Sequence, residues 1–262
     1  MNRVRLAAAS LSGESDSQWA ETAAPYVDAA FLGGVALDDA SREAARELAA
    51  RGRTEFLPED PLAFVDAELG RLVDAPLRVG VNVRSATVSP IRSAGVVCAD
   101  HDAILEINAH CRQDELCAVG CGEALLSDTD RLCRHVAAAA DIGATVSVKV
   151  RTEVPGVDLP ETARRVADAG ATMLHVDAMD SEHVVGDVAA AVGDDLYLVA
   201  NNGVRDAASV GEYVEYGADA VSVGRPSDDP RVLKRVRAAV DEWFGADGAD
   251  EPDGSDEPEV SA

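Results

Sequence analysis

Four short apolar runs between residues 145 and 225 decide the fold, and each carries or ends on polar residues suited to chemistry. They are TVSVKVR (145–151), TMLHVDA (172–178), LYLVANNG (196–203) and AVSVGR (220–225). Four runs of the same type precede them, RVRLAAAS (3–10), AAFLGG (29–34), LRVGVNVR (77–84) and ILEINAH (104–110). Their length and their apolar character predict eight buried strands.

Amphipathic, alanine-rich segments of helical length separate these strands, at 39–52, 61–73, 128–142, 158–170, 181–192 and 206–217. Three of them end in a Gly-Ala pair, Gly143-Ala144, Gly170-Ala171 and Gly217-Ala218, as expected where the residue past a helix turns left-handed. Eight such units predict an α/β fold, a single-domain (β/α)8 TIM barrel over residues 1–244. The alternative, an open doubly wound sheet, would need a G-x-G-x-x-G turn, and Gly13, Gly33 and Gly34 lack that spacing.

The composition indicates an acidic surface. The chain has 262 residues, a net charge of −25 and 23 basic residues, of which only Lys149 and Lys234 are lysines. Together with the low aromatic content, this is typical of a halophilic protein whose surface is adapted to concentrated salt. Residues 245–262, GADGADEPDGSDEPEVSA, have no apolar periodicity and predict a disordered acidic tail.

The sequence says less about the location and the partners of the protein. With no convincing export signal and no spanning segment, we expect a cytoplasmic protein with reduced thiols and no membrane contact. Negative charge normally opposes nucleic-acid binding, but screening shortens to about 3 Å in 1 M salt, so charge does not exclude RNA. The spacing of Cys111, Cys117, Cys121 and Cys133 lacks the C-x2-C of zinc and iron–sulfur sites, and no metal is predicted.

Lys149 is the sharpest candidate, because a chain nearly devoid of lysine places one inside an apolar strand. Its compact ammonium could stabilise the anionic edge of a reduced flavin, and the alternative is a lysine that snorkels to solvent. Arg151 lies on the same side of the strand. It could bind a phosphate or a substrate carbonyl, or it could form a salt bridge at the rim.

Three other groups are predicted to face the same mouth. His175 could donate to a flavin or substrate carbonyl, with Asp177 as the carboxylate that orients it. Asn202-Gly203 and Gly224-Arg225 fall in the loops that follow the seventh and eighth strands, which most often bind phosphate in this fold. Cys111, with a thiol pKa of about 8.5, could donate a proton.

Taken in order, these motifs resemble those of the tRNA-dihydrouridine synthases, and most closely a divergent, barrel-only archaeal branch of them. Residues 9–16 are similar to the family segment A-P-M-x-G-x-T-D, although the Pro-Met pair is absent. Residues 108–112 are similar to the family segment N-x-G-C-P, although its Gly and Pro are replaced. Residues 149–151 match K-x-R, 202–204 match N-G-D with Val204 in place of Asp, and 224–225 match G-R. The likeness spans residues 4–244.

The resemblance implies a flavoprotein in which reduced nicotinamide, NAD(P)H, reduces FMN and the flavin reduces the C5=C6 bond of a uridine in tRNA. It assigns substrate contacts to Asn108 and Arg151, catalysis to Cys111, and FMN contacts to Asn82, Lys149, His175, Asn202, Gly203, Gly224 and Arg225. The family's helical tRNA-binding domain has no counterpart in this sequence. Two alternatives therefore stay open, an FMN-dependent reductase or dehydrogenase of a small pyrimidine-like substrate, and a flavin- or phosphate-binding barrel without turnover.

Overall fold

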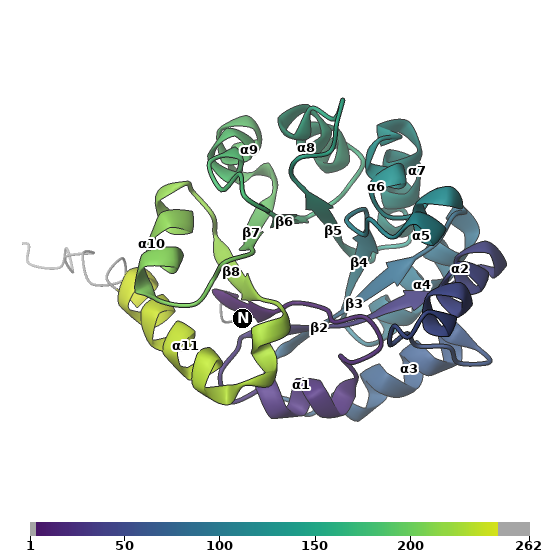
Figure 1. The fold of residues 1–262 in the computed structure, drawn as a ribbon, viewed down its shortest axis with the longest axis horizontal. Helices are drawn as coiled ribbons and strands as arrows, with labels where there is room; N and C mark the ends of the chain where they lie inside the picture. The colour runs from purple at the N-terminus through teal and green to yellow at the C-terminus, as the bar shows by residue number, and fades with distance from the viewer. Residues whose placement is uncertain (1–3, 246–262) are drawn as a thin grey trace, which may run out of the picture.

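Eight parallel strands close into a barrel in the computed structural model, which describes residues 4–245 (Figure 1). Each strand pairs with its neighbours in sequence, and β8 pairs with β1, which confirms the predicted TIM barrel. All eight carboxyl ends therefore meet at one rim. The strands are β1 Leu6–Ala8, β2 Ala29–Ala36, β3 Arg78–Arg84, β4 Ile104–Asn108, β5 Thr145–Arg151, β6 Met173–Asp177, β7 Tyr197–Asn201 and β8 Ala220–Val223.

Helices surround the barrel (Figure 1). The six predicted helices are present as α2 Asp39–Ala50, α3 Pro61–Arg71, α7 Thr129–Ala140, α8 Leu159–Asp168, α9 Val184–Val192 and α10 Ala207–Glu215. The structure adds α1 Ser17–Ala23, α4 Val88–Asp100, α5 Asp114–Ala118, α6 Glu123–Leu126, α11 Pro230–Gly245 and the short 3-10 turns η1 Gly193–Asp195 and η2 Arg225–Asp228. Gly245 ends α11 rather than beginning the predicted tail, and residues 246–262 lie outside the described part of the chain.

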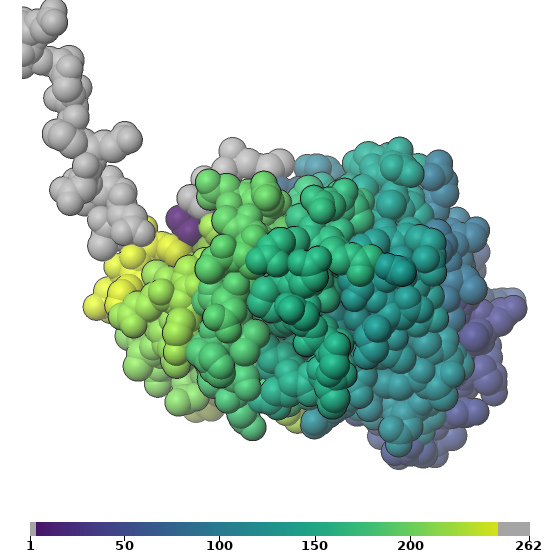
Figure 2. Space-filling view, turned by 90° about the horizontal axis from the view of Figure 1, so that it is seen from above, coloured from purple at the N-terminus to yellow at the C-terminus, as the bar shows by residue number. Residues whose placement is uncertain are grey.

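The predicted Gly-Ala junctions are confirmed as left-handed turns. Gly143, Gly170 and Gly217 have φ values of +84°, +103° and +88°. At Gly170 an added Cβ would lie 2.6 Å from the Cβ of Ala140, so the glycine also lets the end of α8 approach α7. Figure 2 shows one side of the barrel, where the outer faces of the helices form a continuous convex wall.

The barrel interior changes from apolar to polar toward the carboxyl rim. The lowest side chains are apolar and form one buried cluster that includes Ala7, Ala29, Phe31, Ile104, Met173, Val199 and Ala220. The next layer toward the rim, two residues further along several strands, carries fully buried polar groups. These are Asn82, Glu106, Ser147, His175 and Ser222. Because side chains alternate along a strand, one more step of two residues brings polar groups to the rim itself.

Candidate active site

A cavity of about 1020 Å³ opens at the carboxyl rim of the barrel. Such a volume lies at the upper end of the range for small-molecule sites, about 300–1,000 Å³, and suffices for a cofactor beside a substrate group. Nine of the ten predicted site residues line it, namely Asn82, Asn108, Cys111, Lys149, Arg151, Asn202, Gly203, Gly224 and Arg225. His175 does not line it. Their individual roles stay predictions.

Lys149 reaches the cavity wall from β5 with only 4% of its surface exposed. Within residues 4–245, its ammonium makes no hydrogen bond and no ion pair. The side chain therefore does not snorkel to open solvent. The Glu106 and Asp177 carboxylates lie near enough for the Lys149 charge to lower their pKa values, but neither forms an ion pair with it. The ammonium is therefore available to a ligand oxygen or nitrogen.

At the base of the cavity, β3 and β4 are joined by hydrogen bonds between buried side chains. Asn108 Nδ2 donates to Asn82 Oδ1 at 2.9 Å, and Asn82 Nδ2 donates to Glu106 Oε1 at 2.8 Å. Burial raises the pKa of Glu106, but the interactions with His175 and the Lys149 charge outweigh burial and lower the pKa to about 2. Glu106 is therefore a buried carboxylate. Glu106 was not among the predicted site residues, although a lone acid inside the apolar run ILEINAH was a usable signal.

His175 belongs to this buried layer rather than to the cavity surface. Its Nδ1 lies 2.8 Å from Glu106 Oε2, and its Nε2 lies 2.7 Å from Ser222 Oγ. The Ser222 hydroxyl in turn accepts a hydrogen bond from Asn201 Nδ2 at 2.6 Å. The prediction that Asp177 orients His175 is wrong, because Glu106 occupies that place. Burial and the Lys149 charge lower the pKa of His175, so the ring is neutral near pH 7.

The loop that carries Cys111 is fixed from two sides. The Asn108 side-chain oxygen accepts from the backbone N–H groups of His110, at 3.2 Å, and Cys111, at 3.0 Å. On the other side, the Cys111 carbonyl accepts from the N–H of Glu123 at 2.8 Å. Gly122 makes this approach feasible, because a Cβ there would lie 2.0 Å from the Cys111 oxygen.

We expect Gly122→Ala to displace the Cys111 loop. The matched control is Gly143→Ala, because Gly143 is also left-handed but an added Cβ meets nothing within 4 Å. The control should lose only about 1–2 kcal/mol of folding stability, the cost of an L-residue in a left-handed conformation. Gly122→Ala should lose more, because its Cβ also clashes with the backbone of Cys111. Urea unfolding and the rate of Cys111 modification by a thiol reagent measure both effects. Equal stability losses with unchanged Cys111 reactivity would contradict this account.

The environment of Cys111 differs from the ordinary thiol that the sequence suggested. Burial raises the pKa of Cys111, but the charge of Arg84 and a hydrogen bond with His110 outweigh it and lower the pKa to about 6. A pKa of about 6 favours the thiolate at neutral pH, whereas the sequence suggested an ordinary thiol. The catalytic role of Cys111 stays a prediction.

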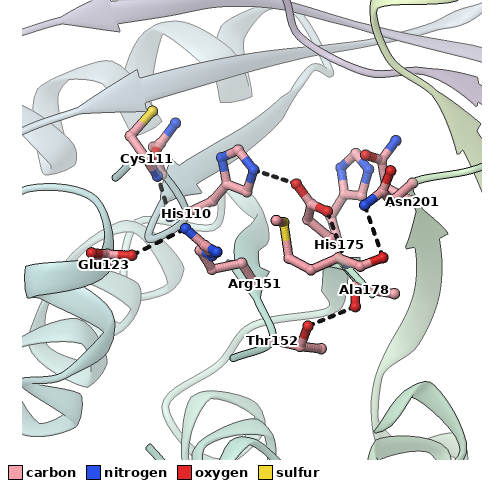
Figure 3. Close-up of polar contacts among 12 residues, drawn as sticks. His110, Cys111, Glu123, Arg151, Thr152, His175, Ala178 and Asn201 are labelled. Carbon is pink, nitrogen blue, oxygen red and sulfur yellow. Dashed lines mark hydrogen bonds and ion pairs between the residues drawn. The ribbon is translucent and has the colours of Figure 1, made fainter. Parts of the chain in front are cut away.

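Two ion pairs reinforce the walls. Arg84, at the end of β3, is 3% exposed, pairs with Glu55 at 2.6 Å and donates to Ser12 Oγ at 2.6 Å. Arg84 was not among the predicted site residues, although it ends LRVGVNVR as Arg151 ends TVSVKVR. Arg151 Nη1 lies 3.2 Å from Glu123 Oε2, so the rim salt bridge considered for it is present (Figure 3).

Comparison with known proteins assigns the chain to a family. The model of the dihydrouridine synthase (Dus) family matches residues 83–246, more than half of the chain. The chain belongs to the dihydrouridine synthase family. Membership supports a TIM-barrel oxidoreductase of the flavin-dependent type. The matched range contains the Cys111 loop, Lys149 and both predicted phosphate loops.

Two relatives of this Dus-family chain differ in how much of it they match. An uncharacterized protein of Methanocaldococcus jannaschii is 25% identical over 233 residues, which are 84% of this chain and 88% of that protein. An indole-3-glycerol phosphate synthase of Rhodococcus opacus is 31% identical over 113 residues, 40% of this chain and 39% of that one.

Two solved structures share the fold. One is DHODH from Eimeria tenella in complex with ferulenol, with a TM-score of 0.56, 16% identity and coverage of 73% of this chain and 67% of that one. The other is a FabK mutant from Thermotoga maritima, with a TM-score of 0.56, 14% identity and coverage of 86% and 62%. At such identities these structures show the barrel fold alone.

The predicted phosphate loops present backbone to the cavity of this Dus-family barrel. Asn202 and Gly203 are both left-handed, with φ values of +92° and +67°, and Tyr213 fixes the turn by donating to the Asn202 carbonyl at 2.9 Å. On the neighbouring strand, Gly224 has open space where a Cβ would stand. Ligand oxygens can therefore approach backbone N–H groups at two adjacent strand ends.

The cavity is electropositive although the chain is strongly acidic. Among the residues that the structure describes, seven basic side chains line it against two carboxylates, Glu14 and Asp177. The basic residues are Arg53, Arg84, Arg112, Lys149, Arg151, Arg205 and Arg225. The site therefore favours an anionic ligand.

Residues 4–245 contain neither a membrane-spanning helix nor a cluster of metal ligands. No helix in this range is long and apolar enough to cross a membrane. No group of three or more His, Cys, Asp or Glu side chains in it is arranged to hold a metal ion. All five cysteines are free thiols.

Proposed function

We propose that this Dus-family protein binds FMN in the rim cavity and reduces the C5=C6 bond of uridine in tRNA, with reduced nicotinamide as the source of electrons. The observation that carries the proposal is Lys149 in the cavity wall, which is 4% exposed and whose ammonium forms no hydrogen bond or ion pair within residues 4–245. Bound FMN would supply the hydride for the pyrimidine ring.

The residues present fit FMN. Lys149 offers a point charge to the flavin N1 and C2 carbonyl edge, and the turns at Gly203 and Gly224 with Arg225 offer N–H groups and a guanidinium to its phosphate. Asn82 lines the cavity floor and is held by Asn108 and Glu106. His175 supports this floor from below through Glu106 rather than by contact with the cofactor.

The residues assigned to the substrate lie in the part of the cavity opposite the predicted phosphate loops. Asn108, Arg151 and Cys111 come from the β4 and β5 ends, across from the predicted phosphate loops of β7 and β8. Arg151 is held by Glu123 and can donate to a uracil carbonyl. Exposed arginines at the mouth, such as Arg112 and Arg225, suit a polyanion better than a neutral free base.

Two experiments test the proposal. Flavin absorbance of the purified protein, or its uptake of added FMN, tests the cofactor, and a protein that cannot take up FMN would favour the barrel without turnover. Mapping dihydrouridine in tRNA from a strain that lacks the gene tests the substrate. Loss of dihydrouridine at one or more positions is expected. Unchanged dihydrouridine everywhere, with FMN bound, would favour the small pyrimidine-like substrate.

Arg112→Gln should weaken tRNA binding and reduce its salt dependence. Arg112 is exposed at the cavity mouth and has no ion pair within the described residues. Loss of one phosphate contact lowers the slope of log K against log salt by about 1. The matched control is Arg92→Gln, because Arg92 is exposed on the outer helix α4. Equal effects of the two changes across a salt titration would count against a rim that binds RNA.

A further inference from the structure

Asn201, the last residue of β7, lines the cavity but has no role in the proposed function. It stands two residues beyond Val199 of the apolar cluster, so it lies in the same layer of the barrel interior as His175 and Ser222. Those two residues are fully buried, whereas Asn201 is 8% exposed. Its amide is therefore the part of this layer that a ligand in the cavity can reach.

The orientation of the Asn201 amide is fixed by Ser222 on the neighbouring strand. Asn201 Nδ2 donates to the Ser222 carbonyl at 3.1 Å and to Ser222 Oγ at 2.6 Å. A carbonyl oxygen can only accept, so the NH2 group must face Ser222 and Oδ1 must point away from it. Within residues 4–245, Asn201 Oδ1 accepts no hydrogen bond, and it is not enclosed by protein. Oδ1 is therefore an acceptor left open to the cavity.

A chain of hydrogen bonds that run in one direction holds this arrangement from below. Glu106 is a carboxylate and can only accept, so His175 Nδ1 carries the proton in their 2.8 Å contact. The other nitrogen of the neutral ring, Nε2, then accepts from the Ser222 hydroxyl at 2.7 Å. With its proton used there, Ser222 Oγ meets Asn201 as an acceptor. A flipped amide would set Oδ1 against two acceptors, so the position of Oδ1 is preorganised.

This acceptor lies between the two ends of the ligand that the proposed function places in the cavity. Lys149 on β5 is the proposed contact of the flavin ring, and the turns at Gly203 and Gly224 are the proposed contacts of the phosphate. Asn201 ends β7 two residues before Gly203. The part of FMN that joins the ring to the phosphate is the ribityl chain, whose hydroxyl groups can donate to an amide oxygen.

We propose that Asn201 Oδ1 accepts a hydrogen bond from a ribityl hydroxyl of FMN, and that Ser222 and His175 are positioning residues for this contact. The identity of the ligand rests on the proposed function. The segment that matches N-G-D begins one residue later, at Asn202, whose Nδ2 donates to the Met179 carbonyl at 3.0 Å. The amide on the cavity floor is thus that of Asn201, which the motif does not include.

The contact is tested by the dissociation constants of FMN, of its 2′-, 3′- and 4′-deoxy analogues and of N3-methyl-FMN, measured by flavin fluorescence on the flavin-free protein. Native protein should bind one deoxy analogue about 3- to 10-fold more weakly than FMN, as expected for one neutral hydrogen bond. Asn201→Ala should bind that analogue and FMN equally. A loss with N3-methyl-FMN alone would give the acceptor to the ring N–H and overturn the ribityl contact.

Gln113→Ala is the matched control, because Gln113 is another amide that lines the cavity, at the start of α5. This variant should keep the preference for FMN, whereas a looser cavity would bind every flavin more weakly by the same factor. Should Asn201→Ala not fold, Ser222→Ala should reduce the preference, because it removes a group that orients the amide. A preference lost in Asn202→Ala but kept in Asn201→Ala would return the contact to Asn202.

The outcome for native protein separates this inference from the proposed function. Native protein that binds FMN and all three deoxy analogues equally would overturn the contact and leave the cofactor assignment standing. Native protein that binds no FMN would overturn both. Binding with the expected preference, but with unchanged dihydrouridine in tRNA from the deletion strain, would support the contact and contradict only the proposed substrate.

Discussion

Lys149→Met is expected to weaken FMN binding by roughly 30- to 1000-fold, while Lys234→Met leaves it unchanged. The expected loss corresponds to about 2–4 kcal/mol, typical when one partner of a buried, charged hydrogen bond is removed. Methionine keeps most of the lysine stem, so packing against the barrel floor is retained. Lys234 is the chain's other lysine and is exposed on α11, which makes it a matched control for charge.

The dissociation constant of FMN, measured by quenching of flavin fluorescence on titration of the flavin-free protein, gives the result directly. Oxidised and reduced FMN should be affected unequally, because the ammonium faces charge that develops on reduction. Lys149→Met should therefore also lower the midpoint potential of bound flavin. Equal affinity and potential in native and variant protein would remove the observation on which the cofactor assignment depends.

The sequence predicted which residues reach the rim, but not which of their side chains contact one another. Nine predicted residues line one cavity because alternation along a strand and the shared direction of parallel strands are local properties that the sequence carries. The partner of His175 is not local. It depends on which residue of β4 stands across the barrel interior, and the structure puts Glu106 there while Asp177 turns to His110.

The state of Cys111 was equally out of reach of the sequence. Arg84 is separated from Cys111 by the whole of α4 and β4, and only the pairing of β3 with β4 brings its charge near the thiol. A hint lay in the family motif, since this chain has His110 where N-x-G-C-P has Gly. A glycine cannot form the Asp177 contact, so this substitution adds an imidazole to the cavity wall beside Cys111.

Helix α4 was missed for a different reason. Its sequence, VSPIRSAGVVCAD, contains Pro90, Gly95 and β-branched residues, all of which lower intrinsic helix propensity. Pro90 falls in the first turn, where a missing N–H is tolerated. Burial of Ile91, Ala94 and Cys98 against the barrel then stabilises the helix. Tertiary packing overrides local preference here, as it commonly does.

Glu106→Ala should destabilise the barrel by about 3–5 kcal/mol, because it leaves the donors of Asn82 and His175 without their buried acceptor. The matched control is Glu43→Ala, since the Glu43–Arg46 ion pair has an N–O distance of 2.7 Å but exposed side chains, and should lose less than about 1 kcal/mol. Urea unfolding at pH 7 compares the two. Should Glu106→Ala not fold, Glu106→Gln, which keeps the shape, should still lose more than the control.

The pH dependence of this difference separates a buried carboxylate from a buried neutral acid. The folded-state pKa of Glu106, about 2, is depressed from the ordinary value of 4.5, so its ionised form is the one that folding favours. Its contribution to stability is fully present above about pH 4.5 and is lost as pH falls toward 2. The stability gap between native protein and Glu106→Gln should therefore be constant from pH 5 to 8 and shrink in acid. A gap that widens in acid would mean that Glu106 is protonated in the folded barrel, and Lys149 would then lack the buried negative charge that stabilises its own.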